Sequence, residues 1–366
     1  MVRVQLPYGE EAWLATRYAD VRTVLGDPRF SRAASVDRDE PRMTPQRVDG
    51  GILAMDPPEH TRLRRLVARA FTARRVEQLR PRTREIADDL LTRMIDSGPP
   101  ADLVTAFATP LPITVICELL GVPVADQDGF HVWSEAIVST TSLPPERIRE
   151  YLDNLYAYIA GLVAERRHAP RDDLISALVE ARDQRDKLSE TELVQLIAGL
   201  LAAGHETTVT QIPNFVYALL THPDEWERLK SAPQLIPNAV EELMRWVPLG
   251  VGSSFPRYAL EDVDIGGVRV RAGEPVIASL SSANRDETVF ADPDRLDLTR
   301  AVNPHLGFGH GVHHCLGAQL ARMELQVALA ALLDRLPGLR LAVPEAELAW
   351  KSGLLVRGLR TLPVTW

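Results

Sequence analysis

One long helix constrains the fold of this chain more than any other feature of the sequence. Ser189 and Glu192 form an S-x-x-E capping box, and a helical pattern follows from about residue 190 to about residue 220. Residues 196–203 are apolar on both faces of that helix, which predicts that it is buried. Pro213 falls within the pattern and removes one helical hydrogen bond, so it predicts either a kink or an earlier helix end. Burying such a helix requires a large, mainly helical protein around it.

The remaining pattern agrees with a mainly α fold. Helical periodicity extends over most of residues 57–247, whereas residues 1–15 and 254–281 contain short apolar alternations typical of strands. Residues 31–55 are polar and aperiodic, which predicts a long loop. Because the 366 residues contain neither a repeat nor an obvious linker, we expect one domain over 1–366, mainly α with small β sheets.

Composition excludes several classes of protein. The net charge of −9 argues against a protein that binds nucleic acid, which needs excess Lys and Arg to meet phosphate. We find no run of about 18 apolar residues and no apolar leader at the N-terminus, so we expect neither a membrane span nor a secretory signal. Two cysteines, Cys117 and Cys315, do not make a disulfide scaffold. These features predict a cytoplasmic protein.

The segment with the most distinctive chemistry is residues 304–317, where glycines surround Cys315 and a helix follows. Glycine permits backbone conformations closed to other residues, and a thiolate ahead of a helix is stabilised by the positive end of the helix dipole. Such a thiolate suits a metal ligand that must stay anionic. A structural loop around a buried thiol is one alternative. A zinc site is the other, although neighbouring ligands are awkward for one tetrahedral ion; its candidates are His310, His313, His314 and Cys315.

The full spacing, Phe-Gly-x-Gly-x-His-x-Cys-x-Gly over residues 308–317, resembles the haem-binding signature of the cytochrome P450 family. The likeness runs to the last residues of the chain and is strongest to soluble actinomycete members that modify secondary metabolites. It implies the cytochrome P450 fold, haem b as cofactor and Cys315 as the axial iron ligand. Family members carry an extra helix before the first strands, whereas this chain starts later than usual, almost at the strands. The resemblance also implies that three more residues of the signature bind the cofactor: Phe308, Gly309 and Gly317.

Residues 203–208, Ala-Gly-His-Glu-Thr-Thr, lie midway along the long helix. An acid and hydroxyls inside an apolar helix are costly unless they are hydrogen-bonded or in contact with water, which indicates either a helix distortion or a proton-delivery site. The match to the family's oxygen-activation motif implies the proton-delivery site. Thr207 would then hold the proton network at dioxygen, Glu206 would relay protons to it, and the small Ala203 would leave room for oxygen beside the cofactor.

The resemblance implies a role for each of two pairs of residues. His60 and Arg64 are four residues apart on one predicted helix and point the same way, as on any basic helix face. The family match implies that both contact the haem propionates, together with Arg257 and His313. Glu242 and Arg245 are three apart and can pair on a helix. The family match implies a structural network there, with Arg295 as the third partner.

The resemblance implies a monooxygenase that uses O₂ to hydroxylate or epoxidise a small apolar molecule. A macrolide or other polyketide suits the pocket, and a terpenoid or steroid would fit as well; the lining residues are Leu200, Ala203, Leu249, Val251 and Leu354. The chain is too short to hold a flavin domain as well, so a monomer would receive electrons from a ferredoxin and its reductase. A basic patch would dock the ferredoxin through Arg62, Arg65, Arg69, Arg74, Arg75 and Arg322.

Three other functions stay open. A peroxide-driven haem enzyme is disfavoured because Glu206 and Thr207 keep the acid and alcohol needed for O₂ activation. A haem-binding or sensor protein without turnover is the second, and a zinc protein is the third.

Overall fold

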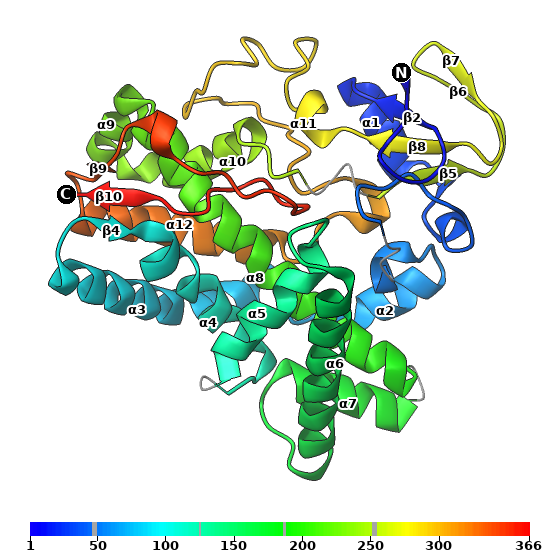
Figure 1. Ribbon diagram of the computed structural model, residues 1–366, viewed down its shortest axis with the longest axis horizontal. Helices are drawn as coiled ribbons and strands as arrows, with labels where there is room; N and C mark the ends of the chain where they lie inside the picture. The colour runs from blue at the N-terminus through cyan, green and yellow to red at the C-terminus, as the bar shows by residue number, and fades with distance from the viewer. Residues whose placement is uncertain (46–49, 124–125, 186–187, 251–254) are drawn as a thin grey trace. The chain divides into compact units, whose positions relative to one another are not determined.

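The computed structural model describes residues 1–45, 50–123, 126–185, 188–250 and 255–366 (Figure 1). The chain forms two compact units. Unit 1 contains Met1–Arg62 and Glu241–Leu316, and unit 2 contains Leu63–Val240 and Gly317–Trp366. Two helices cross the unit boundaries: α2 (Glu59–Ala68) and α10 (Ile236–Trp246).

Unit 1 is built on a five-stranded sheet in the order β1-β2-β8-β5-β3. β2 and β8 pair in parallel, and the other neighbours are antiparallel. The sheet and the short helices α1 and α11 enclose a core of apolar side chains that includes Val21, Phe30 and Val276. The elements are β1 (Val2–Val4), β2 (Ala12–Ala15), α1 (Tyr18–Gly26), β3 (Phe30–Ser31), β5 (Arg257–Ala259), β8 (Pro275–Ala278) and α11 (Leu280–Ala283). A separate hairpin joins β6 (Val263–Ile265) to β7 (Val268–Val270).

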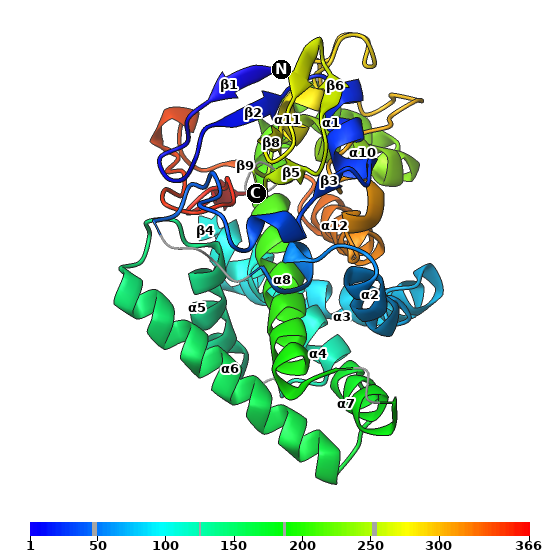
Figure 2. The same ribbon diagram turned by 90° about the vertical axis from the view of Figure 1, so that its right-hand side faces the viewer.

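Unit 2 is helical, and α8 lies at its centre (Figure 2). Helices α4, α5, α6 and α12 all pack against α8, and α3 packs against α12. A small antiparallel sheet has the order β4-β10-β9. The helices are α3 (Ala73–Ser97), α4 (Pro110–Leu120), α5 (Gln127–Val138), α6 (Pro145–His168), α7 (Leu174–Arg185), α8 (Glu190–Leu220), α9 (Pro223–Ser231) and α12 (Ala318–Arg335). The strands are β4 (Ala101–Asp102), β9 (Arg340–Leu341) and β10 (Pro363–Thr365).

Helix α8 confirms the sequence prediction in detail. The Ser189 hydroxyl accepts from the Glu192 backbone N–H at 3.1 Å, and the Glu192 carboxylate accepts from the Ser189 N–H at 2.7 Å, which completes the capping box. The helix continues past Pro213 to Leu220, so an earlier end is wrong. Because the helix is packed on several sides, tertiary contacts outweigh the single hydrogen bond that proline removes.

The predicted loop over residues 31–55 holds more structure than its composition suggested. Short 3₁₀ turns form at Ala33–Ser35 and at Gly51–Ala54, and residues 46–49 lie outside the described part of the chain. Among the helices that the structure describes, none is long and apolar enough to cross a membrane.

A buried carboxyl group lies between two central helices of unit 2. Glu324 on α12 is fully buried, and burial raises its pKa well above the usual value, outweighing the opposing effect of the Thr208 hydroxyl on α8. Neither of its oxygens has a hydrogen-bond partner of normal geometry within the described residues. Burial therefore favours the neutral acid in the folded protein.

We expect Glu324→Gln to stabilise the protein increasingly as pH rises from 5 to 8. Above the unfolded-state pKa of about 4.3, the unfolded chain releases this proton while the folded chain keeps it, so the wild type loses stability with rising pH. The wild type loses about 1.4 kcal/mol of stability for each pH unit above the unfolded-state pKa, until the pH reaches the folded-state pKa. Glutamine does not titrate, so the variant keeps its stability over this range. Denaturant unfolding across this pH range measures the difference. Glu347→Gln, an exposed change of the same kind, is the control; a pH-independent gain in Glu324→Gln would contradict the expectation.

Candidate functional site

The cysteine loop folds back on itself within unit 1. The Cys315 N–H donates to the Phe308 carbonyl at 2.8 Å, and the Gly309 N–H donates to the Leu306 carbonyl at 2.8 Å. A 3₁₀ turn at Gly311–His313 lies between these bonds, and Gly317 is the N-cap of α12. Cys315 is exposed and takes no part in a disulfide, whereas Cys117 is buried. The loop thus holds the Cys315 backbone in place while leaving its thiol accessible, as a metal ligand requires.

Steric constraints explain why two positions of the loop are glycine. Gly309 and Gly311 have φ values of 75° and 73°, in the left-handed region that side chains disfavour. A Cβ on Gly311 would also lie 2.3 Å from the Leu25 carbonyl oxygen on α1. Any larger residue there would push the loop away from α1, so the close approach of the two segments explains this glycine.

The zinc interpretation finds no support in the arrangement of side chains. Among the residues that the structure describes, no three His, Cys, Asp or Glu side chains come together as a metal site would need. The His310 ring instead lies near Gly26 on α1, where an added Cβ would come within 3.2 Å of its Cδ2 atom. Burial and the Arg22 charge lower the pKa of His310. The accessible thiol therefore has no zinc-type partner set around it in the described structure.

A cluster of buried basic side chains lies beside the loop in unit 1. The His60 and His313 rings are 4.3 Å apart between centroids, and His60, Arg257 and Arg32 are 2%, 6% and 4% exposed. Burial, with a smaller effect of Arg32, lowers the pKa of Arg257 to about 10. Burial, followed by the charges of His60, Arg257 and Arg32, lowers the pKa of His313 to about 3. The site concentrates positive charge in a place poor in water.

Two residues of this basic cluster have polar atoms with no hydrogen-bond or ion-pair partner in the described part of the chain. The buried Nε2 of His313 makes no hydrogen bond, and Arg257 makes no ion pair, among the described residues. Arg32, in contrast, donates from Nε to the Leu53 carbonyl at 3.0 Å and from its backbone to Asp56 at 2.9 Å. A buried arginine and a buried imidazole with open donor positions fit carboxylate groups of a ligand. The cluster therefore fits the two propionates of haem.

Arg32 was not predicted from the sequence, and no motif marks it. It follows β3 immediately, and its guanidinium also hydrogen-bonds the Pro256 carbonyl, next to Arg257. It thereby fixes the backbone that carries Arg257. Arg64 lies on α2, one turn after His60 and partly buried, as the spacing predicted.

We expect Arg257→Gln to weaken haem retention while leaving the haem-free protein as stable as the wild type or more stable. The change removes a charge-assisted contact of about 1.5–3 kcal/mol, which corresponds to roughly 10- to 100-fold faster haem loss. Without haem, it relieves repulsion between two buried guanidinium groups. Haem transfer to excess apomyoglobin gives the rate, and unfolding of the haem-free protein gives the stability. Arg269→Gln, at an exposed arginine of β7, is the control; equal rates of haem loss would refute the role.

The polar segment of α8 presents two different sides. Leu200, Ala203 and Thr207 share one helix face; Ala203 is exposed and the other two are partly exposed, on a helix that is otherwise largely buried. The Thr207 hydroxyl donates to the Ala203 carbonyl at 2.9 Å. This open face of small and apolar side chains is the part of unit 2 that suits contact with a flat cofactor or an apolar substrate.

Glu206 points away from that face. Neighbouring residues of a helix diverge by about 100°, and the Glu206 side chain turns toward α5, where it is 3% exposed. The Ser134 hydroxyl donates to Glu206 Oε1 at 3.0 Å, and His205 Nε2 lies 3.2 Å from the same oxygen. The sequence signalled Glu206 but not Ser134, which belongs to no motif and lies 72 residues earlier.

The predicted pocket residues fall in different parts of the structure. Leu354 in unit 2 is held against the end of α5, where the Leu355 N–H donates to the Val138 carbonyl at 2.8 Å. Leu249 is partly buried in unit 1, and Val251 lies outside the described residues. Leu200 and Ala203 share the open face of α8.

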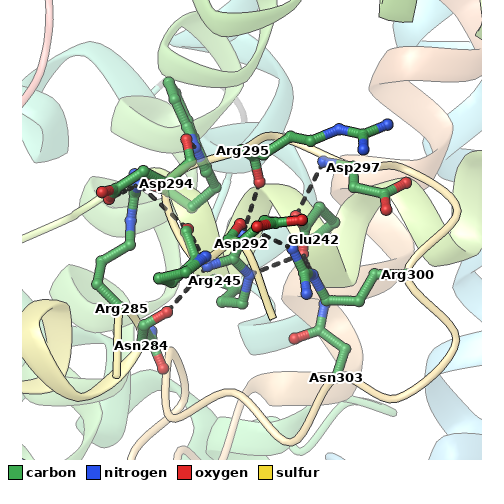
Figure 3. Close-up of polar contacts among 12 residues, drawn as sticks. Glu242, Arg245, Asn284, Arg285, Asp292, Asp294, Arg295, Asp297, Arg300 and Asn303 are labelled. Carbon is green, nitrogen blue, oxygen red and sulfur yellow. Dashed lines mark hydrogen bonds and ion pairs between the residues drawn. The ribbon is translucent and has the colours of Figure 1, made fainter. Parts of the chain in front are cut away.

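The Glu242–Arg245 pair is present and fully buried in unit 1 (Figure 3). Arg245 Nη2 donates to Glu242 Oε1 at 2.7 Å. Two more side chains donate to Glu242 Oε2: Arg300 through Nε and Asn303 through Nδ2, each at 3.1 Å. The prediction of Arg295 for this place is wrong for its side chain, which is exposed and points away (Figure 3). Its backbone carbonyl instead accepts from Arg245 Nη2 at 3.1 Å, because the loop turns its main chain toward the pair.

Comparison with known proteins identifies the class to which this fold and loop belong. The cytochrome P450 family matches residues 145–337. Mycinamicin IV hydroxylase/epoxidase of Micromonospora griseorubida is 62% identical over 100% of this chain and 92% of its own length. Nocardicin C N-oxygenase of Nocardia uniformis subsp. tsuyamanensis is 54% identical over 100% of this chain and 92% of its own. The crystal structure of HinD superposes with a TM-score of 0.97 at 53% identity, covering 100% of this chain and 92% of HinD.

The chain belongs to the cytochrome P450 family. It is a monooxygenase of bacterial type with haem b as its cofactor, and it requires O₂, redox partners and a small-molecule substrate. The mainly α fold with small sheets is confirmed.

Proposed function

We propose that this enzyme hydroxylates or epoxidises a macrolide or related polyketide, and that Cys315 would bind its haem iron through the thiolate. The observation that carries the proposal is full-length similarity to mycinamicin IV hydroxylase/epoxidase at 62% identity. A relative named for vitamin D(3) 25-hydroxylation, at 45% identity, fits the same preference for bulky, largely apolar molecules.

The residues of the chain have separate tasks in this proposal. Haem, when bound, supplies O₂ activation and transfer of one oxygen atom to the substrate. Cys315 provides the anionic sulfur ligand from a loop fixed by its hydrogen bonds. Arg257 and His313 hold the propionates through donor atoms that have no hydrogen-bond or ion-pair partner among the described residues. His60, whose ring contacts that of His313, and Arg64 are further contacts. These assignments rest on the buried basic cluster and the exposed thiol.

The open face of α8 provides the substrate side of the site. Leu200 and Ala203 offer apolar contact, and Thr207 offers a hydroxyl whose proton can be exchanged with a bound ligand. Leu354, in the same unit, extends the proposed lining, whereas Leu249 and Val251 stay predictions from the sequence. Glu206 supplies protons to this face from the buried side of the helix.

A ferredoxin and its reductase would supply the electrons. The enzyme would act as a monomer, in the reducing cytoplasm. Arg65, Arg69, Arg74 and Arg75 are exposed at the end of α2 and the start of α3, and they give unit 2 a basic surface suited to an acidic ferredoxin. Arg62 and Arg322 are partly buried, and we assign them to the edge of the same docking surface.

The test is oxidation of mycinamicin IV by the haem-loaded enzyme with a ferredoxin and reductase under ¹⁸O₂, followed by mass spectrometry. We expect a product that carries one labelled oxygen atom. A label that enters only from H₂¹⁸O₂, without reductase, would favour the peroxide-driven alternative. Oxidation of nocardicin C but of no macrolide would overturn the proposed substrate class, since a relative with that activity is 54% identical. Absence of any oxidation with a bound macrolide would favour a sensor.

A further inference from the structure

We infer that His305 is a positioning residue, whose imidazole ties the backbone ahead of Cys315 to helix α10 and so keeps the thiolate in place as a ligand. This role rests on the proposed function, because it takes Cys315 as the haem ligand. His305 lies ahead of the haem-binding signature over residues 308–317, and it acts on the ligand only through the backbone of the cysteine loop.

The His305 imidazole makes polar contacts through both of its nitrogens within unit 1. The Gly307 N–H donates to Nδ1 at 3.0 Å, and Nε2 lies 3.0 Å from Glu241 Oε2 on α10. The His305 side chain is only 3% exposed, so the surrounding protein holds the ring in this orientation. The imidazole therefore joins the loop backbone directly to a helix that is distant in the sequence.

The Gly307 amide fixes the tautomer of the ring. A backbone N–H only donates, so His305 Nδ1 must present a lone pair to it. The single hydrogen of the neutral imidazole is then on Nε2, where it donates to the Glu241 carboxylate. In the other tautomer, a hydrogen on Nδ1 would point at the hydrogen of the Gly307 amide, and the contact would be repulsive. Each nitrogen of the neutral ring thus has a hydrogen bond of the sense that it needs.

Steric contact holds the same segment against α10. A Cβ on Gly307 would lie 2.8 Å from the Met244 carbonyl oxygen and 3.0 Å from His305 Nδ1. Any side chain there would force the loop backbone away from the helix, and glycine avoids this clash. The place of Gly307 is therefore fixed by two independent features, the close approach to the α10 backbone and the hydrogen bond to the imidazole.

A second set of hydrogen bonds from α10 reaches the neighbouring residue of the loop. Arg245 Nη1 donates to the Asn284 carbonyl at 2.9 Å (Figure 3), and the Leu306 N–H donates to Asn284 Oδ1 at 2.7 Å. Asn284 is 3% exposed, so this connection is buried as well. Two successive backbone amides of the loop are thus tied to α10, Leu306 through Asn284 and Gly307 through His305.

One further hydrogen bond connects this segment to Cys315. The carbonyl of Phe308, the residue after Gly307, accepts from the Cys315 N–H at 2.8 Å. Fixing the Gly307 amide limits the backbone rotations that would move this carbonyl, and with it the main chain of Cys315. A thiolate is stabilised by the metal that it binds, whereas a free thiol is mostly protonated at neutral pH. A loosened loop would therefore favour a protonated, displaced thiol.

Two variants of His305 separate the two hydrogen bonds of its ring. Asparagine places Oδ1 where the ring has Nδ1, so His305→Asn keeps an acceptor for Gly307 and loses the donor to Glu241. Glutamine places its amide nitrogen where the ring has Nε2, so His305→Gln keeps the donor and loses the acceptor. The Glu241 side chain is 27% exposed, so water can replace its donor. His168→Gln, at an exposed histidine of α6, is the control.

We expect the red-shifted Soret band of the reduced, CO-bound holoenzyme to be lost in mild denaturant roughly tenfold faster in His305→Gln than in the wild type. In the same diamagnetic form, NMR should show faster hydrogen exchange of the Gly307 amide. His305→Asn should stay within about twofold of the wild type in both measurements, because it keeps that bond. Equal rates in the two variants, or wild-type rates in His305→Gln, would overturn the positioning role.

A further measurement uses the wild type itself. In the ferrous, CO-bound holoenzyme, ¹⁵N NMR of the imidazoles reports which nitrogen of His305 carries hydrogen, with the signals assigned by their loss in His305→Asn. We expect a bare Nδ1 and a protonated Nε2, and a hydrogen on Nδ1 would overturn the inference. If the wild type shows no red-shifted band, the proposed ligation by Cys315 fails, while the tautomer and the Gly307 exchange rate still decide on the role of His305.

Discussion

Replacing Arg245 with alanine is expected to lower the free energy of unfolding by about 3–5 kcal/mol, because it leaves a charge buried without its partner. The Arg245 and Glu242 side chains are both 0% exposed, and two hydrogen bonds of 2.7 and 2.8 Å join them. Arg245 also donates to three backbone carbonyls of the surrounding loops, at Asn284, Pro293 and Arg295. Alanine would remove all five of these hydrogen bonds at once, although Glu242 would keep the bond from Arg300 and the Pro293 carbonyl the one from Arg285 Nη1 at 3.3 Å.

Arg300 cannot compensate fully, since one guanidinium cannot replace the contacts that Arg245 makes across three chain segments. Denaturant unfolding of the haem-loaded variant measures the loss. The matched control is Arg269→Ala, whose partner Asp264 is 69% exposed, and we expect a change of about 1 kcal/mol or less there. Similar effects at the two sites would show that the buried network contributes no more than a surface ion pair.

Cys315→Ser is expected to abolish monooxygenase activity, down to the background of the protein-free reaction, while haem continues to bind. With haem bound, the anionic sulfur of Cys315 would donate electron density to the iron, as O₂ activation needs, and a neutral hydroxyl in its place would donate far less. The loop's main-chain bonds from Cys315 and Gly309 do not involve the thiol, so the fold should survive. The measurement is the absorption spectrum of the reduced, CO-bound protein, in which the strongly red-shifted Soret band should disappear.

Cys117→Ser is the control for that experiment. Cys117 is buried on α4, and burial raises the pKa of its thiol to about 12, so it remains an un-ionised packing residue. We expect some loss of stability in this variant but an unchanged red-shifted band. Persistence of the band in Cys315→Ser would exclude Cys315 as the ligand.

Sequence reasoning succeeded where the physical signal is local. The α8 capping box is a four-residue pattern, and it predicted the start of the helix at Ser189. The glycines around Cys315 indicated a tight loop, and the structure shows the backbone angles and the approach to α1 that require them. Features of this kind depend on neighbours in the chain, so composition and spacing are enough to find them.

Partners from distant segments could not be predicted in the same way. Ser134 meets Glu206 only because α5 packs on α8, and the chain carries no motif around it. The choice between Arg295 and Arg300 depends on how an irregular loop turns its side chains, which no periodicity reports. Arg32 joins the basic cluster because β3 pairs with β5, and the sequence pattern gives no sign of this long-range pairing.

The two sides of α8 have a consequence for how this enzyme can be altered. Leu200 and Ala203 face outward on a different side from Glu206, so their side chains can be exchanged without touching the contacts of Ser134 or His205. Directed evolution confined to these two positions should therefore yield catalysts with new regioselectivity that remain well coupled. Point substitutions on one helix face can thus change where the substrate is oxidised, while the polar contacts of the opposite face stay intact.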